Sequence, residues 1–353
     1  NYSTSIGKKS IAGVYNSKHN AFALGNATQA TGEDSYAFGS RAKATGEKSF
    51  AFGSVGLDDG GIPTTTPTQA NGDYSTAIGM GAVAGAKGAM ALGVGSYSSG
   101  TYSSSLGYYS TAYGQYSTAL GYKSTANGYA SGVLGYTARS DGSYSIAIGN
   151  NSYVTSTAQY SVAIGDSAKV QGYYAAALGD RAKAKANYSV AIGYNALSTV
   201  TGIAAGSFGY YATARGTYSV AVGPFASTAA TASAAGAFGY YAQANGNYSV
   251  AVGFDARANA ADAGAFGRSA WASGPTSIAI GYNSKTDVTG TSAGAFGYNS
   301  YAKGPTSVAV GSGAQTGATA TDAGSFGKGA IANGVGSVAI GSGATTGASA
   351  SNA

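Results

Sequence analysis

The residues best suited to chemistry in this chain are its tyrosines, which number 29 among 353 residues. Eighteen of them occupy two fixed places in a short sequence repeat. A phenol ring combines an apolar face with a hydroxyl group, and tyrosine is enriched at the energetic centres of protein interfaces. The pattern indicates either an exposed binding surface or a stabilising aromatic ladder, and both interpretations stay open. The candidates for partner binding are the doubled tyrosines Tyr108, Tyr109, Tyr210, Tyr211, Tyr240 and Tyr241.

Residues for catalysis or metal binding are scarce. The chain has one histidine, no cysteine and 13 acidic residues, which form no nucleophile–base pair and no metal-ligand cluster. We therefore expect no enzyme activity and no cofactor. Asp58 and Asp59 are a candidate cation-binding pair, but a polar turn explains them as well. The glycine-rich segments lack the strand–helix context of a phosphate loop and are interpreted as turns.

Net charge and hydropathy narrow the range of partners. The formal net charge of +6 is spread over few charged residues, so no nucleic-acid partner is predicted. No apolar run approaches the roughly 18–20 residues of a membrane span, and we expect no membrane contact by this segment itself.

A hexapeptide repeat must position these side chains. The segment 188–193, Tyr-Ser-Val-Ala-Ile-Gly, recurs along the chain, and 23 copies align on its final glycine. Of the 22 spacings between these glycines, 15 are 14 residues and five are 16 residues. A short fixed period of this kind is the signature of a solenoid.

One period contains two short alternating stretches separated by glycines, which predicts strand, turn, strand, turn. At about 3.3 Å per residue, 14 residues give a flat coil with a perimeter of roughly 46 Å. Strands of successive coils must pair in parallel, and 23 coils at ~4.8 Å would extend on the order of 110 Å.

The alternation also assigns faces. We expect Val190 and Ile192 to point into the coil, and Ser189 and Ala191 to form an outward stripe of small residues. An uninterrupted stripe predicts association of several chains, most simply three. The predicted trimer interface consists of Ser189, Ala191, Ser219 and Ala221.

Two features divide the chain. Residues 1–192 follow the 14-residue period with an insertion at about 54–68, whose exposed candidates are Asp58, Asp59 and Ile62. In residues 193–353 the residue before the anchor glycine alternates between Phe and Val or Ile. Each Phe has a glycine two positions earlier, which indicates volume compensation and a two-coil (14+16) repeat.

The motif Ser-x-Ala-(Ile/Val/Phe)-Gly-x-x-Ala-x-Ala-x-Gly, seen at 189–193 and 39–46, closely resembles the head repeat of YadA-like trimeric autotransporter adhesins. The resemblance implies a left-handed parallel β-roll assembled as a homotrimer. It also implies a place on the bacterial cell surface, with a C-terminal outer-membrane anchor outside this segment. The implied partners are a host matrix protein of the collagen or fibronectin type or a host cell-surface glycoprotein receptor.

Other functions stay open. A head segment that binds nothing could be a structural spacer that presents another binding domain. Hexapeptide-repeat transferases would need coils made of three hexapeptides and a catalytic histidine, and ice-binding solenoids would need regular Thr-x-Thr rows. Neither pattern is present beyond fragments such as Thr64–Thr66.

Overall fold

The computed structural model describes residues 2–13, 20–57 and 61–352. The chain divides into two compact units, Asn1–Tyr174 and Ala175–Ala353. The described residues contain strands and turns but no helix, so none of them forms a helix able to cross a membrane. The change of repeat pattern at Gly193 lies inside the second unit.

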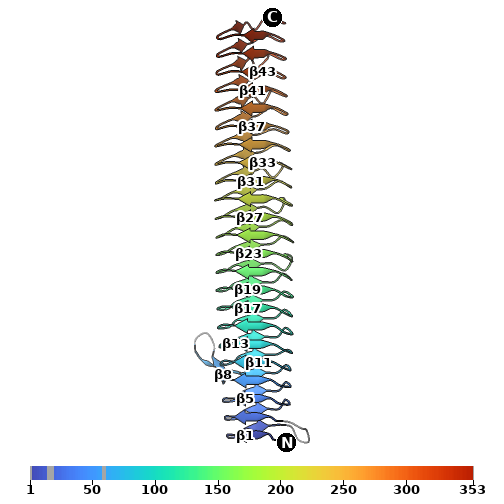
Figure 1. Cartoon of the computed structure of the whole chain (residues 1–353), viewed down its shortest axis with the longest axis vertical. Coiled ribbons are helices and arrows are strands. Elements are labelled where there is room, and N and C mark those ends of the chain that lie inside the picture. The colour runs from blue at the N-terminus through green and yellow to red at the C-terminus, as the bar shows by residue number, and fades with distance from the viewer. Residues whose placement is uncertain (1, 14–19, 58–60, 353) are drawn as a thin grey trace. The chain divides into compact units, whose positions relative to one another are not determined.

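Each unit is a stack of coils, and each regular coil contributes one three-residue strand and one two-residue strand (Figure 1). The three-residue strands form the first sheet of a unit and the two-residue strands form its second sheet.

In the first unit, the first sheet consists of β1 (Thr4–Ile6), β3 (Phe22–Leu24), β5 (Tyr36–Phe38), β7 (Phe50–Phe52), β11 (Thr76–Ile78), β13 (Met90–Leu92), β15 (Ser104–Leu106), β17 (Thr118–Leu120), β19 (Gly132–Leu134), β21 (Ile146–Ile148) and β23 (Val162–Ile164). Its second sheet consists of β2 (Ile11–Ala12), β4 (Gln29–Ala30), β6 (Lys43–Ala44), β10 (Gln69–Ala70), β12 (Val83–Ala84), β14 (Tyr97–Ser98), β16 (Thr111–Ala112), β18 (Thr125–Ala126), β20 (Arg139–Ser140), β22 (Tyr153–Val154) and β24 (Lys169–Val170).

In the second unit, the first sheet consists of β25 (Ala176–Leu178), β27 (Val190–Ile192), β29 (Gly206–Phe208), β31 (Val220–Val222), β33 (Gly236–Phe238), β35 (Val250–Val252), β37 (Gly264–Phe266), β39 (Ile278–Ile280), β41 (Gly294–Phe296), β43 (Val308–Val310), β45 (Gly324–Phe326) and β47 (Val338–Ile340). Its second sheet consists of β26 (Lys183–Ala184), β28 (Leu197–Ser198), β30 (Thr213–Ala214), β32 (Ser227–Thr228), β34 (Gln243–Ala244), β36 (Arg257–Ala258), β38 (Trp271–Ala272), β40 (Lys285–Thr286), β42 (Tyr301–Ala302), β44 (Gln315–Thr316), β46 (Ile331–Ala332) and β48 (Thr345–Thr346).

Equivalent residues of successive coils pair in parallel register. Ala221 pairs with Ala237, and Ala237 pairs with Ala251 in the following coil. The prediction of a parallel β-solenoid built on the 14-residue period is therefore confirmed.

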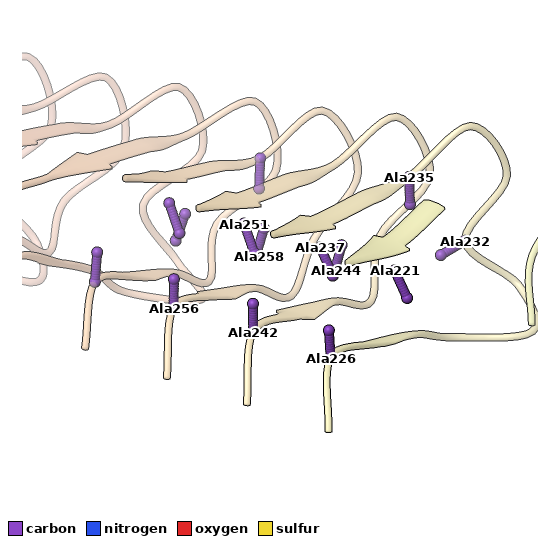
Figure 2. Packing of buried hydrophobic residues seen from close by; sticks show 14 of the residues in the cluster. Ala221, Ala226, Ala232, Ala235, Ala237, Ala242, Ala244, Ala251, Ala256 and Ala258 are labelled. Atoms are coloured by element: carbon purple, nitrogen blue, oxygen red, sulfur yellow. The ribbon is translucent and has the colours of Figure 1, made fainter. Parts of the chain in front are cut away.

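The interior of each coil is thin and consists almost entirely of alanine and serine. In the second unit, the alanine side chains of the two sheets point toward one another between the strands, as for Ala237 and Ala244 (Figure 2). The largest fully buried side chains among the described residues are Val154 and Val170. Buried serines close the turns, as where Ser219 Oγ donates to Gly216 O at 2.6 Å. The hydroxyl group is therefore satisfied without water.

The predicted assignment of faces is wrong. Ser189, Ala191, Ser219 and Ala221 are completely buried inside their own coils, so they cannot contact a partner chain. The β-branched residues face outward instead, and Ile192 is 36% exposed. The reason is space, since two strands joined by tight turns leave a narrow interior that small side chains fill. It accepts single valines, such as Val154 and Val170, but not a valine and an isoleucine from every coil.

The compensation between Phe and Gly exists, but on the outer face of the first sheet. A Cβ added at Gly236 would lie 2.6 Å from Cε2 of Phe238. The ring therefore folds back over its own glycine and occupies the place that a β-branched side chain takes in the next coil.

The insertion forms a hairpin instead of a plain loop. Strand β8 (Val55–Leu57) pairs with β9 (Pro63–Pro67) in antiparallel fashion. The hairpin approaches the coils closely, because a Cβ at Gly81 would lie 2.7 Å from Gly56 Cα. Ile62 is 64% exposed, as predicted for a surface residue. Asp58 and Asp59 lie outside the described residues.

Candidate binding surface

The turn after each anchor glycine places two side chains on the outside of the coil. In the turn that starts at Gly209, Ala212 N–H donates to Gly209 O at 3.2 Å, so Tyr210 and Tyr211 occupy the two central positions. Tyr211 adopts a left-handed conformation with φ of 54°. Equivalent left-handed residues in other coils of this unit include Phe225 and Tyr241. Because the coils are in register, these side chains form two adjacent columns.

In the second unit the two columns together form a surface that we call the aromatic stripe, which is continuous from Tyr194 to Phe254 and resumes at Tyr282 beyond Arg268. Its rings belong to Tyr194, Tyr210, Tyr211, Phe225, Tyr240, Tyr241, Phe254, Tyr282 and Tyr298.

Contacts within the aromatic stripe alternate between stacked and edge-on. Phe225 stacks on Tyr211 and on Tyr241, with ring centroids 5.6 Å and 4.8 Å apart. Tyr240 meets Tyr241 edge-on at 4.5 Å and stacks on Phe254 at 5.3 Å. Aromatic pairs at these distances stabilise the surface by about 0.5–1.5 kcal/mol each.

Two arginines interrupt or border the aromatic stripe. The guanidinium group of Arg181 lies 5.9 Å from the ring centroid of Tyr194 and donates to its hydroxyl group at 3.1 Å. Arg268 lies between Phe254 and Tyr282, at 5.3 Å and 5.5 Å from their ring centroids. The aromatic stripe is therefore rigid, apolar on its ring faces and positively charged where the arginines lie.

The hydroxyl group of Tyr240 is a hydrogen-bond donor at neutral pH. Reduced contact with water is the main cause that raises the pKa of Tyr240, and the neighbouring Tyr241 adds to this effect. Both Tyr240 and Tyr241 are 40% exposed, so a partner can reach them. Rigid rings with accessible hydroxyl groups are suited to protein or glycan recognition.

The first unit brings its predicted tyrosines into a different setting. Tyr108 stacks on Tyr122 at 5.4 Å, and Tyr122 stacks on Tyr136 at 4.8 Å. Tyr109 meets Tyr108 edge-on at 4.7 Å, but its hydroxyl group donates to the carbonyl oxygen of Leu57 in the hairpin. Tyr109 therefore has a structural contact that its counterparts Tyr211 and Tyr241 do not share.

The other tyrosine column lies at the opposite turn, five residues before the anchor glycine. In the first unit it is a ladder, with Tyr144, Tyr160 and Tyr174 stacked at 4.9 Å per step. In the second unit Tyr218 and Tyr248 are separated by a coil that carries Ala234 at this place. They are 67% and 64% exposed.

Sequence reasoning missed two aromatic residues of the stripe, Phe225 and Phe254. Phe225 holds the same place after its anchor glycine as Tyr211 and Tyr241, so column position would have revealed it where a search for tyrosine did not. The described residues contain no group of three or more histidine, cysteine or acidic side chains that could hold a metal ion.

The stacked coils and their parallel register define a parallel β-solenoid. Its repeated side chains form long exposed rows on the outside of the coils. The sequence model of the YadA head domain repeat matches most of the chain, at residues 17–35, 30–54, 66–82, 84–110, 112–131, 133–152, 156–181, 171–196, 201–226, 230–256, 258–284 and 289–314. The chain therefore belongs to the family of YadA head domain repeats, the head segments of trimeric autotransporter adhesins.

The chain is similar to the crystal structure of the collagen-binding domain of the Yersinia adhesin YadA, with 23% sequence identity and a TM-score of 0.25. That similarity covers 49% of this chain and 78% of the other. No curated protein matches the sequence.

Proposed function

We propose that this chain is the binding head of a bacterial surface adhesin and that the aromatic stripe contacts the host partner. The supporting observation is the continuous row of exposed, rigidly stacked rings in the second unit. The partner class is a host matrix protein of the collagen or fibronectin type or a host cell-surface glycoprotein. The head acts on the outside of the bacterium, anchored in the outer membrane through another region of the protein.

The aromatic stripe favours binding over a purely mechanical role. A spacer needs stacked coils, and buried alanines with backbone hydrogen bonds already provide them. Exposed aromatic rings in a long row add surface that attracts partners and lowers solubility. Their presence is explained if they form an interface.

The adhesion test compares the two turns of the same unit. The double variant Tyr210→Ala and Tyr240→Ala removes two rings of the aromatic stripe, and we expect attachment to the partner to weaken at least about 30-fold, since interface tyrosines often contribute 2 kcal/mol or more. The measurement is binding of the purified chain to immobilised matrix proteins and receptor ectodomains.

The matched control is the double variant Tyr218→Ala and Tyr248→Ala at the opposite turn, which should bind as the unaltered chain does. Equal loss in both variants would contradict a specific role for the aromatic stripe. An unaltered chain that binds none of the host proteins would instead favour the structural spacer.

We also propose that the head assembles as a homotrimer through the outer face of the first sheet. That face carries an apolar side chain before every anchor glycine of the second unit, and most of them are exposed, including Ile192, Val222 and Phe238. A repeated apolar row of this length is costly in water and identical on every copy of the chain. We therefore propose that two further copies of the chain cover this face. The interface would then consist of these apolar side chains and not of the serines and alanines expected from the sequence.

The mass of the purified chain in solution tests this assembly. We expect a particle of three times the 34.3 kDa chain mass. Substitution of Val222 and Val252 by Asp should convert it to monomers with unchanged circular dichroism, because these side chains lie outside the coil. A stable monomer of the unaltered chain would contradict the trimer.

A further inference from the structure

A cavity lies on the outer face of the second sheet, which is separate from the aromatic stripe. It spans three coils, where Trp271 of β38, Lys285 of β40 and Tyr301 of β42 are in register. The cavity has a volume of about 300 Å³. Its lining comprises Trp271, Ser273, Lys285, Asp287, Val288 and Tyr301.

Aromatic rings and cations alternate along this row. Arg257 lies 4.7 Å from the ring centroid of Trp271, and Lys285 Nζ lies 5.0 Å from it. Coils repeat every ~4.8 Å, so the rings of Trp271 and Tyr301 are about 10 Å apart, with the flexible lysine side chain between them. A single six-membered ring can enter this space if the lysine side chain rotates.

The acidic group of the site is already engaged. Tyr301 Oη donates to Asp287 Oδ2 at 2.8 Å, and the backbone N–H of Thr289 donates to Asp287 Oδ1 at 3.4 Å. The Tyr301 hydrogen bond is the main cause that lowers the pKa of Asp287, so this carboxylate is a fixed, ionised acceptor.

The basic group of the site is available. Arg257 is paired with Asp255 at 2.9 Å, whereas Lys285 forms no ion pair with any residue that the structure describes. The cavity thus offers one unpaired positive charge, which suits an anionic oxygen ligand.

We infer that this cavity binds one carboxylate-bearing pyranose unit of a host glycan. The Trp271 edge and the Tyr301 ring would contact the C–H faces of the sugar ring. The ammonium group of Lys285 would pair with the carboxylate, and Ser273 and Asp287 would bond to hydroxyl groups. A volume of about 300 Å³ is at the lower limit for ligand pockets, which fits a single sugar unit better than a peptide segment.

The acidic-sugar site does not depend on the aromatic stripe. It lies on the second sheet, and a chain could use either surface alone. Three copies in an assembled head would present three such sites, so that weak binding of single sugars would be multiplied on a glycan-coated surface.

The test uses the full chain and its single tryptophan, Trp271, as the reporter. The chain is titrated with N-acetylneuraminic acid, glucuronic acid or the neutral sugar N-acetylglucosamine. Fluorescence emission is recorded with excitation selective for tryptophan. We expect a saturable change with an acidic sugar at a dissociation constant on the order of 1 mM, and at least about tenfold weaker binding of the neutral sugar.

Two charge-neutralising variants separate the site from general electrostatics. Lys285→Gln should weaken binding of the acidic sugar about tenfold, to the affinity of the neutral sugar. Lys303→Gln removes the same charge from a residue that lies over the Tyr301 ring at 4.7 Å but does not line the cavity, and it should bind normally.

The outcomes are distinct. A response to N-acetylneuraminic acid alone identifies a sialylated glycan, and a response to glucuronic acid alone identifies a uronic-acid polymer. No saturable response to either acid, or an equal effect of both variants, would overturn the inference. Neither result bears on the adhesion assay of the aromatic stripe, because tryptophan emission reports only this cavity.

Discussion

Substitution of Gly239 by alanine is expected to destabilise its coil by about 3–5 kcal/mol. Gly239 has φ of 134°, a conformation that residues with a side chain rarely adopt. A Cβ atom there would also lie 2.5 Å from the carbonyl oxygen of Gly253 in the next coil. The cost therefore combines backbone strain with separation of two coils that hydrogen-bond to each other.

Hydrogen exchange measures this effect where it arises. The amide of Gly253 donates to Phe238 O at 2.8 Å, and it should exchange much faster in the Gly239→Ala variant. The control is Gly329→Asn, because Gly329 has φ of 66° and a Cβ there would meet nothing within 4 Å. Asn299 already occupies the equivalent position with φ of 53°. Similar stability of both variants would contradict the steric explanation.

Substitution of Ala251 by leucine is expected to destabilise the second unit by at least about 3 kcal/mol. Ala251 is completely buried and pairs in register with Ala237 and Ala265. A larger side chain would force the two sheets apart, because the interior is already filled by methyl groups. Chemical denaturation followed by circular dichroism measures the loss.

The neighbouring substitution Val252→Leu is the matched control. Val252 is 38% exposed on the outer face of the coil, where the proposed trimer contacts lie. Both variants are therefore compared in a chain made monomeric by Val222→Asp, where Val252→Leu should change the free energy of unfolding by less than about 0.5 kcal/mol. If Val252→Leu destabilised the chain more than Ala251→Leu, the assignment of faces described here would be reversed.

The period of the sequence was sufficient to predict the class of fold. Glycines at a fixed spacing mark the turns, and the two alternating stretches between them became the paired strands of each coil. The register follows directly, since a repeat without insertions places equivalent residues side by side. Ala221, Ala237 and Ala251 illustrate this.

The face that each strand buries was predicted wrongly, although alternation correctly indicated which residues share a face. Valine and isoleucine are usually buried, and this general preference favoured the wrong side for Val190 and Ile192. The decisive quantity was the width of the coil, which is too small for a valine and an isoleucine from every strand of the first sheet. Serine and alanine occupy most buried places because they fit in every coil, and Val154 and Val170 are isolated exceptions.

The binding surfaces could be predicted only in part. Tyr210, Tyr211, Tyr240 and Tyr241 were identified because they are adjacent in sequence. The contribution of Phe225 and the cavity beside Trp271 depends on contacts between coils, where residues 14 or 16 positions apart meet. No local motif marks such places. The hairpin contact of Tyr109 with Leu57 spans 52 residues and is equally invisible in a local pattern.

The register of the coils has a consequence for how such a chain can change its length. Removal of residues 224–253 would join Gly223 to Phe254, and the alternation before the anchor glycines would continue from Val222 to Phe266. A gene that encodes such repeats can lose or duplicate a unit by recombination between similar segments without breaking a hydrogen-bonded ladder. The number of copies of a surface site can thus vary between generations while the fold of each coil is unchanged.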